Sequence, residues 1–131
     1  MTENKPLIQG LGNDILEIAR LRRVIEAHNK RALDRLFTPK EQLYCLKYKD
    51  PIPHLAGRFA AKEAIVKALG YGIGKLISWK DIEILNNPEG KPEVFLSPTL
   101  KTRFNSPNIL LSISHCRNYA TAVAIWCTTA T

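Results

Sequence analysis

Residues 55–69 read LAGRFAAKEAIVKAL and are followed by Gly70. Alanine, leucine, lysine and glutamate are strong helix formers, and a glycine just past the last turn is a common helix end. On a helical wheel the apolar side chains cover nearly the whole circumference, which is typical of a buried helix. The sequence therefore predicts a central helix around which the rest of the chain packs.

Four ionisable side chains interrupt this apolar helix: Arg58, Lys62, Glu63 and Lys67. Buried charges must be paired with an opposite charge, a ligand or a metal ion. Glu63 and Lys67 are four residues apart and share a helix face, so an ordinary surface salt bridge explains that pair. Taken together, the four groups also fit a site for a phosphate-rich ligand and a cation.

The composition fits one globular domain covering residues 1–131, with 45% hydrophobic and 24% charged residues. The net charge of +7 indicates an acidic partner, such as a nucleic acid, an acidic protein or a polyphosphate ligand. Residues 1–10 lack the apolar core of a signal peptide, and no run approaches the roughly 20 apolar residues of a membrane span. Three cysteines without metal spacing favour a reducing cytoplasm.

Periodicity and turn residues predict the elements around the central helix. The segment Thr38-Pro39-Lys40-Glu41 is a capping box that starts a helix running to about Tyr48. The prolines of residues 50–53 end this helix, and His54 is expected in a turn or cap. The other expected elements are a strand at 6–14, two helices within 15–36 separated at 28–30, β-hairpins at 81–96 and 108–127, and a short helix at 98–104. This order predicts the α+β class with a mainly antiparallel sheet.

Three further segments each allow a structural and a functional interpretation. Gly10 and Gly12 permit a close backbone approach, or they belong to an incomplete phosphate loop that ends near Asp14. His115 ends a predicted strand and is either a turn residue or a phosphate contact, and no Gly-x-Ser-x-Gly motif supports a serine hydrolase. The basic ridge is either a solvated helix face or a docking surface for an acidic helix; it consists of Arg20, Arg22, Arg23, Lys30, Arg31 and Arg35.

Four motifs in order resemble those of the holo-[acyl-carrier-protein] synthases, small trimeric members of the phosphopantetheinyl transferases. They are GLGNDI at 10–15, GRFAAKEA at 57–64 with Lys67, GKP at 90–92 and SISH at 112–115. The resemblance spans nearly the whole chain. It implies a 4′-phosphopantetheinyl transferase-like fold, in which antiparallel strands pack with helices.

The resemblance also implies an activity in fatty acid biosynthesis. The 4′-phosphopantetheine arm of coenzyme A is transferred to a serine of apo acyl carrier protein, which releases adenosine 3′,5′-bisphosphate. Asp14 and Glu63 are the implied Mg²⁺ ligands, and Mg²⁺ commonly takes only one or two carboxylates besides water and substrate phosphates. Lys67 would neutralise the pyrophosphate, and Glu63 is the candidate base for the serine proton.

Further positions follow from the same resemblance. The implied coenzyme A contacts are Arg58, Lys62, Lys67 and His115, with Gly90, Lys91 and Pro92 bordering the adenine. The acidic, helical carrier protein would dock on Arg20, Arg31 and Arg35. The active site would lie between subunits of a homotrimer, so that His115 serves a neighbouring subunit.

Two other classes of protein remain as alternatives. A small basic nucleic-acid-binding module agrees with the net charge, but neither an RRM-like aromatic pattern nor a helix-turn-helix is evident. Such a charge-driven binder would tolerate the loss of Asp14. A non-catalytic trimeric scaffold would not bind coenzyme A in a Mg²⁺-dependent way. We expect an enzyme whose partners include neither nucleic acid nor membrane.

Overall fold

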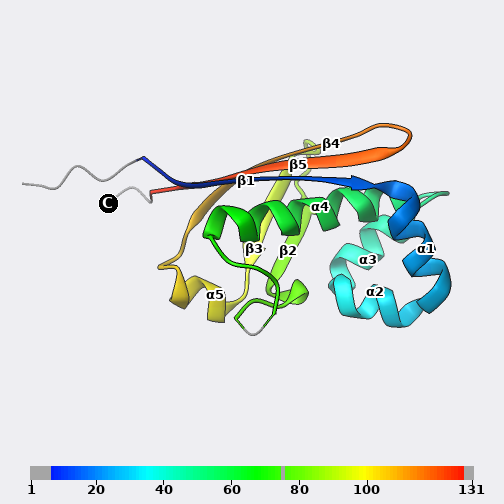
Figure 1. Cartoon of the computed structure of the whole chain (residues 1–131), viewed down its shortest axis with the longest axis horizontal. Helices are drawn as coiled ribbons and strands as arrows, with labels where there is room; N and C mark the ends of the chain where they lie inside the picture. The colour runs from blue at the N-terminus through cyan, green and yellow to red at the C-terminus, as the bar shows by residue number, and fades with distance from the viewer. Residues whose placement is uncertain (1–6, 75, 129–131) are drawn as a thin grey trace, which may run out of the picture.

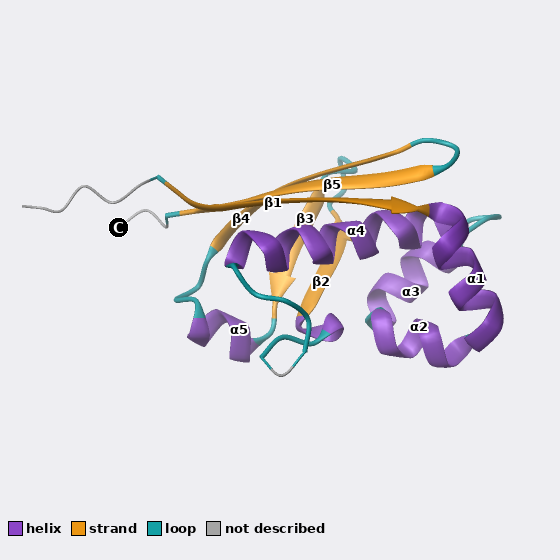
Figure 2. Cartoon of the chain, viewed as in Figure 1, coloured by secondary structure: helices purple, strands orange, loops and turns teal. Residues whose placement is uncertain are grey.

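The computed structural model describes residues 7–74 and 76–128. Its elements, in chain order, are β1 (Ile8–Glu17), α1 (Ile18–His28), α2 (Lys30–Leu36), α3 (Pro39–Leu46), α4 (Ile52–Leu69), the 3₁₀ turn η1 (Trp79–Asp81), β2 (Ile82–Asn86), β3 (Pro92–Leu96), α5 (Pro98–Arg103), β4 (Asn108–His115) and β5 (Tyr119–Cys127). Figure 1 shows their arrangement, and Figure 2 separates helices from strands by colour. The expected α+β class is confirmed.

All strand pairs are antiparallel, and they form two sheets. The larger sheet has the order β1-β5-β4, and β2 and β3 form a separate hairpin. Helix α4 packs along one face of the larger sheet, with α1, α2 and α3 grouped near one of its ends and α5 near the other (Figure 1). Along β5, Ala120, Ala122 and Ala124 are buried while Tyr119 and Val123 are exposed. This alternation follows the two-residue period of a strand.

Helix α4 is buried almost all round, as the sequence predicts, and Ala60, Ala61 and Ala64 are fully covered. It ends at Gly70, whose φ of 84° is left-handed. The helix begins earlier than expected, however, because it includes Pro53 in its first turn. A proline is tolerated there, since the first N–H groups of a helix have no partner within it. The prediction that His54 lies in a turn or cap is therefore wrong, and His54 is helical.

Strand β1 lies unusually close to α4. A Cβ atom added to Gly12 would lie 1.9 Å from the carbonyl oxygen of Ala64, and one added to Gly10 would lie 1.9 Å from that of Ala68. The two glycines therefore serve a close backbone approach. Because β1 continues to Glu17, beyond the expected end of the strand, Asp14 lies inside the strand and beside the helix.

The start of α3 is confirmed in detail. The Thr38 hydroxyl accepts a hydrogen bond from the Glu41 N–H at 3.2 Å, and a Glu41 carboxylate oxygen accepts one from the Thr38 N–H at 2.9 Å. The helix ends at Leu46, slightly before the expected Tyr48. Within residues 7–74 and 76–128, no helix has both the length and the apolarity needed to cross a membrane.

Candidate active site

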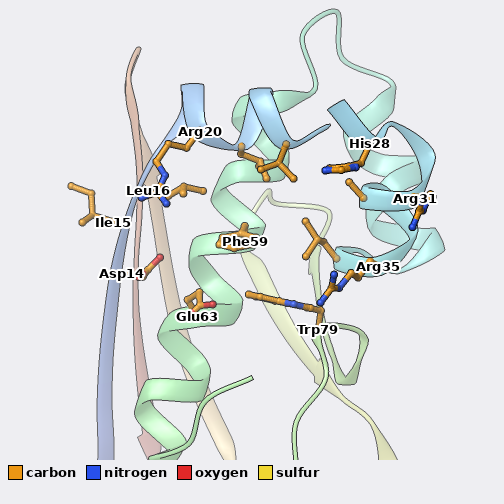
Figure 3. Close-up of a pocket in the computed structure, with 14 residues that line it drawn as sticks. Asp14, Ile15, Leu16, Arg20, His28, Arg31, Arg35, Phe59, Glu63 and Trp79 are labelled. Atoms are coloured by element: carbon orange, nitrogen blue, oxygen red, sulfur yellow. The ribbon is translucent and has the colours of Figure 1, made fainter. Parts of the chain in front are cut away.

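A cleft of about 640 Å³ separates β1 and α4 from α1 and α2. We call it the main cleft, and Figure 3 shows the side chains around it. Asp14 from β1 and Glu63 from α4 lie at one side, and the aromatic rings of Phe59 and Trp79 lie nearby. The structure thus brings together two acidic residues that are 49 positions apart in the sequence. Three of the basic residues also line this cleft: Arg20, Arg31 and Arg35.

The two carboxylates influence each other electrostatically. Partial burial raises the pKa of Glu63, the negative charge of Asp14 raises it further, and Lys67 opposes both effects. The Lys67 ammonium lies 3.1 Å from a carboxylate oxygen of Asp14 and donates a hydrogen bond to the Asn13 carbonyl at 3.0 Å. A cation bound beside these carboxylates would favour the ionised form of Glu63.

The chemistry of this donor set fits Mg²⁺. Within the described ranges, no cluster of three or more histidine, cysteine, aspartate or glutamate side chains could hold a metal. Mg²⁺ needs fewer protein ligands, because waters and substrate phosphates complete its octahedron. Asp14 and Glu63 are the residues that could hold such an ion.

A second cavity of about 240 Å³ lies between the start of α4 and the β2–β3 hairpin. It brings together four of the residues expected to bind coenzyme A, namely Arg58, Gly90, Pro92 and His115. The Arg58 guanidinium donates a 2.9 Å hydrogen bond to the Asn86 side chain and lies 4.4 Å from the centre of the Tyr44 ring. Lys91 does not line this cavity, and its backbone N–H bonds the Asn87 side chain within the hairpin turn.

The two cavities open on different sides of α4. Arg58 and Glu63 are five residues apart, which places them about 140° apart around a helix of 3.6 residues per turn. Arg58 lines the second cavity, whereas Glu63 lines the main cleft. The expected site residues that line these cavities therefore lie in two separate groups.

Lys62 lines neither cavity, and its expected contact with coenzyme A stays a prediction. Its side chain is fully buried, and its ammonium lies 2.7 Å from a Glu41 carboxylate oxygen. It also donates hydrogen bonds to the carbonyls of Leu36, at 2.8 Å, and Trp79, at 3.0 Å. All three N–H groups of the ammonium thus have acceptors inside the protein. These contacts join α4 to three other segments of the chain.

Residues 10–124 match the family model of the 4′-phosphopantetheinyl transferase superfamily. The chain belongs to this superfamily. It is 58% identical over 117 residues to a holo-[acyl-carrier-protein] synthase of Protochlamydia amoebophila, covering 89% of this chain and 96% of that protein. The resemblance inferred from the sequence motifs is confirmed at the level of the family.

Solved structures of superfamily members show the same fold. The holo-(acyl-carrier-protein) synthase of Bacillus anthracis, in complex with CoA (3′,5′-ADP), matches with a TM-score of 0.83 and 34% identity, over 95% of this chain and all of that one. The Helicobacter pylori enzyme in complex with coenzyme A matches with a TM-score of 0.81 and 38% identity, over 88% of this chain and 98% of that one. The roles of individual residues in this chain stay predictions.

Several side chains around these cavities lie outside the superfamily motifs used above. Trp79 stacks on Phe59 in the main cleft, with ring centroids 4.7 Å apart. Trp79 is the first residue of the 3₁₀ turn η1. His54 and Asn86 line the second cavity. No spacing or composition signal in the sequence marks these two positions.

Proposed function

We propose that this chain is a holo-[acyl-carrier-protein] synthase that transfers 4′-phosphopantetheine from coenzyme A to a serine of apo acyl carrier protein. The observation that carries this proposal is the main cleft. It places a carboxylate pair suited to Mg²⁺ beside three arginines suited to an acidic protein. Relatives of the same family are solved with coenzyme A, which supports the choice of donor.

The chain's own residues then have defined tasks. Asp14 and Glu63 would hold Mg²⁺, which when bound supplies positive charge to the pyrophosphate. The Lys67 ammonium, already at the Asp14 carboxylate, stabilises negative charge on the leaving bisphosphate. The serine oxygen forms the new bond to phosphorus as the bond to adenosine bisphosphate breaks. Glu63 is the residue placed to accept the serine proton, through a water molecule where the carboxylate is engaged with the metal.

We further propose a homotrimer in which the second cavity of one subunit faces the main cleft of the next. This would unite two groups of residues that lie on different sides of α4. The sheet face opposite α4, here called the outer face, supports the proposal. Figure 1 shows no helix over it, and it carries exposed apolar side chains at Leu11, Ile15, Leu110 and Val123. An apolar face of this kind is typical of a protein–protein contact.

Arg20, Arg31 and Arg35 are the proposed docking residues for the carrier protein. Within the described part of the chain, none of their guanidinium groups pairs with a carboxylate, whereas Arg22 pairs with Asp50 at 2.8 Å. Reversing Arg20 and Arg31 to glutamate should weaken carrier-protein affinity and its salt dependence, and should spare coenzyme A binding. Titration of apo carrier protein at two salt concentrations measures this, with Arg103→Glu on α5 as the matched control. An unchanged affinity would make the three arginines an ordinary solvated face.

The reaction itself is tested by mass spectrometry. Apo carrier protein incubated with this protein, coenzyme A and Mg²⁺ should gain the mass of one phosphopantetheine group, and removal of divalent cations by a chelator should abolish the gain. Unmodified carrier protein in the complete reaction would contradict the proposal. We place the enzyme in the cytoplasm, which agrees with three free cysteines.

A further inference from the structure

His54 lines the second cavity from the first turn of α4. Its imidazole stacks on the Tyr48 ring, with centroids 3.6 Å apart and planes 16° apart. It also meets the His115 ring edge to face, at a centroid distance of 5.8 Å. The Tyr48 hydroxyl is in turn hydrogen-bonded to that of Tyr44 at 3.0 Å. An aromatic wall therefore holds the His54 ring next to a residue expected to contact phosphate.

Arg58 supplies independent evidence that this cavity takes a ligand. The residue is only 4% exposed, and its Nε–H has no hydrogen-bond partner among the described residues. Its terminal nitrogens donate to the His54 carbonyl and the Asn86 side chain. A nearly buried guanidinium in the cavity wall, without a carboxylate partner among the described residues, suits an anionic ligand.

The charges around His54 are mostly positive. Arg58 and His115 face it from α4 and β4, and Lys47 faces it from the end of α3; Tyr44 and Tyr48 are its other titratable neighbours. Asp50 is the nearby carboxylate, and it is held in a two-bond pair with Arg22 at 3.1 and 2.8 Å. Burial lowers the pKa of His54, and electrostatic interaction with His115 and with Arg58 lowers it further, against the effect of Asp50. An anion bound in the cavity would favour the protonated imidazole and so raise the pKa of His54.

We propose that His54 is a third contact, beside Arg58 and His115, for the 3′-phosphate of coenzyme A, and that it takes up a proton from solvent when this phosphate binds. The inference rests on the proposed function, because it assigns the nucleotide end of coenzyme A to the second cavity. A guanidinium and two imidazoles are suited to a dianionic phosphate monoester. The pyrophosphate belongs instead with Lys67 and the carboxylate pair.

The direction of the pH effect follows from the charges. In the free protein burial, and then the positive neighbours, lower the pKa of His54 and favour the neutral imidazole. A dianionic phosphate stabilises the imidazolium, so bound His54 has a higher pKa than free His54. Between these two values binding takes up a proton, and affinity rises as the pH falls from about 8 to about 6.5. Below about pH 6 the phosphate itself is protonated and the gain ends.

Isothermal titration calorimetry of the full chain tests the proposal, with coenzyme A, dephospho-coenzyme A and adenosine 3′,5′-bisphosphate as probes. The variant His54→Phe keeps an aromatic ring on Tyr48 but loses the imidazole. It should weaken bisphosphate binding roughly tenfold at about pH 6.5 and leave dephospho-coenzyme A within about twofold of wild type. Proton uptake, read from two buffers of different ionisation enthalpy, should be smaller than in wild type, because His115 is then the only imidazole left at the phosphate. His54→Gln restores a neutral donor and should recover part of the affinity without restoring the lost proton uptake.

Three results would overturn the assignment of His54. They are unchanged bisphosphate affinity in His54→Phe, proton uptake in that variant as large as in wild type, and equal losses for coenzyme A and dephospho-coenzyme A. The last would mean that the ring supports the cavity and does not contact the 3′-phosphate. Failure of the wild-type protein to bind coenzyme A at all would instead contradict the proposed function.

Discussion

Glu63 combines a proposed catalytic task with a cost in stability. Its pKa is raised above the ordinary value of 4.5, first by burial and then by Asp14. A carboxyl group with a raised pKa in the folded state stabilises the fold while it is protonated. That contribution is complete below the ordinary pKa and is lost as the pH rises through the raised value. At neutral pH the ionised carboxylate therefore makes the fold less stable than a neutral side chain would.

The variant Glu63→Gln should accordingly separate activity from stability. We expect its transfer rate to fall roughly 100-fold or more, because a metal ligand and base is lost. Its melting temperature at about pH 7 should exceed that of wild type, and the difference should shrink towards about pH 4. Transfer assays and scanning calorimetry measure the two effects, with Glu89→Gln in the exposed hairpin turn as control. Near-normal turnover would refute the assigned role.

Lys62 differs from Glu63, because all the described contacts of its ammonium lie inside the protein. Lys62→Met would leave Glu41 buried without its counter-ion, and we expect the free energy of unfolding to fall by roughly 3–5 kcal/mol. Glu41 also accepts hydrogen bonds from the N–H groups of Thr38 and Ile84. The double variant Lys62→Met/Glu41→Gln should regain part of the loss, since no unpaired charge remains.

Urea unfolding of the two Lys62 variants and of an exposed control, Lys101→Met, provides the comparison. If Lys62→Met had the same free energy of unfolding as wild type, the buried ion pair would not be what holds these segments together. If Lys62→Met had normal stability but did not bind coenzyme A, that result would support the predicted contact between Lys62 and coenzyme A.

At the scale of elements, the contact between β1 and α4 positions the metal-site candidates. Asp14 is two residues after Gly12 on β1, and Glu63 directly precedes Ala64, whose carbonyl oxygen faces Gly12. The distance between strand and helix therefore determines how close the two carboxylates lie. Only a residue without a Cβ atom allows that distance.

Gly12→Ala should push β1 away from α4. Overpacking usually costs about 1–3 kcal/mol, and here the added atom would meet rigid backbone, so we expect at least that loss in urea unfolding. The transfer rate should fall as well, because Asp14 moves with the strand. Gly72→Ala is the matched control, since a Cβ there has nothing within 4 Å. Equal stability of the two variants would contradict the close approach.

At the scale of the whole molecule, the proposed trimer predicts complementation between inactive variants. Glu63→Gln lacks a group of the main cleft, and His115→Ala lacks a group of the second cavity. If each site uses one group from each of two subunits, random mixing of equal amounts restores about a quarter of the sites. Transfer assays after subunit exchange measure this recovery.

The matched control mixes Glu63→Gln with Asp14→Asn. Both changes affect the main cleft of a single chain, so every site in the mixture lacks one group and no activity should return. Recovery in this control, or none in the test mixture, would argue for a site built within one subunit.

Local patterns were sufficient to predict most elements of this chain. The capping box at Thr38, the left-handed Gly70 and the hairpin turns are short-range signals, and the structure agrees with them. The family was also evident, because its motifs are local in sequence. Pro53 was misjudged because the same residue suits both the end of one helix and the first turn of another.

The sequence by itself determined the central helix, the strands and the set of charged residues that a phosphate-rich ligand requires. Only the tertiary structure decided which of those charges face a cavity. A helix that is apolar nearly all round has no marked polar face, so periodicity does not distinguish Lys62 from its neighbour Glu63. The segments packed on each side of α4 decide which charge is buried. Glu41 of α3 pairs with the buried Lys62, and Asp14 of β1 lies near Glu63. Such contacts join residues distant in the chain, and a single sequence carries no local signal for them.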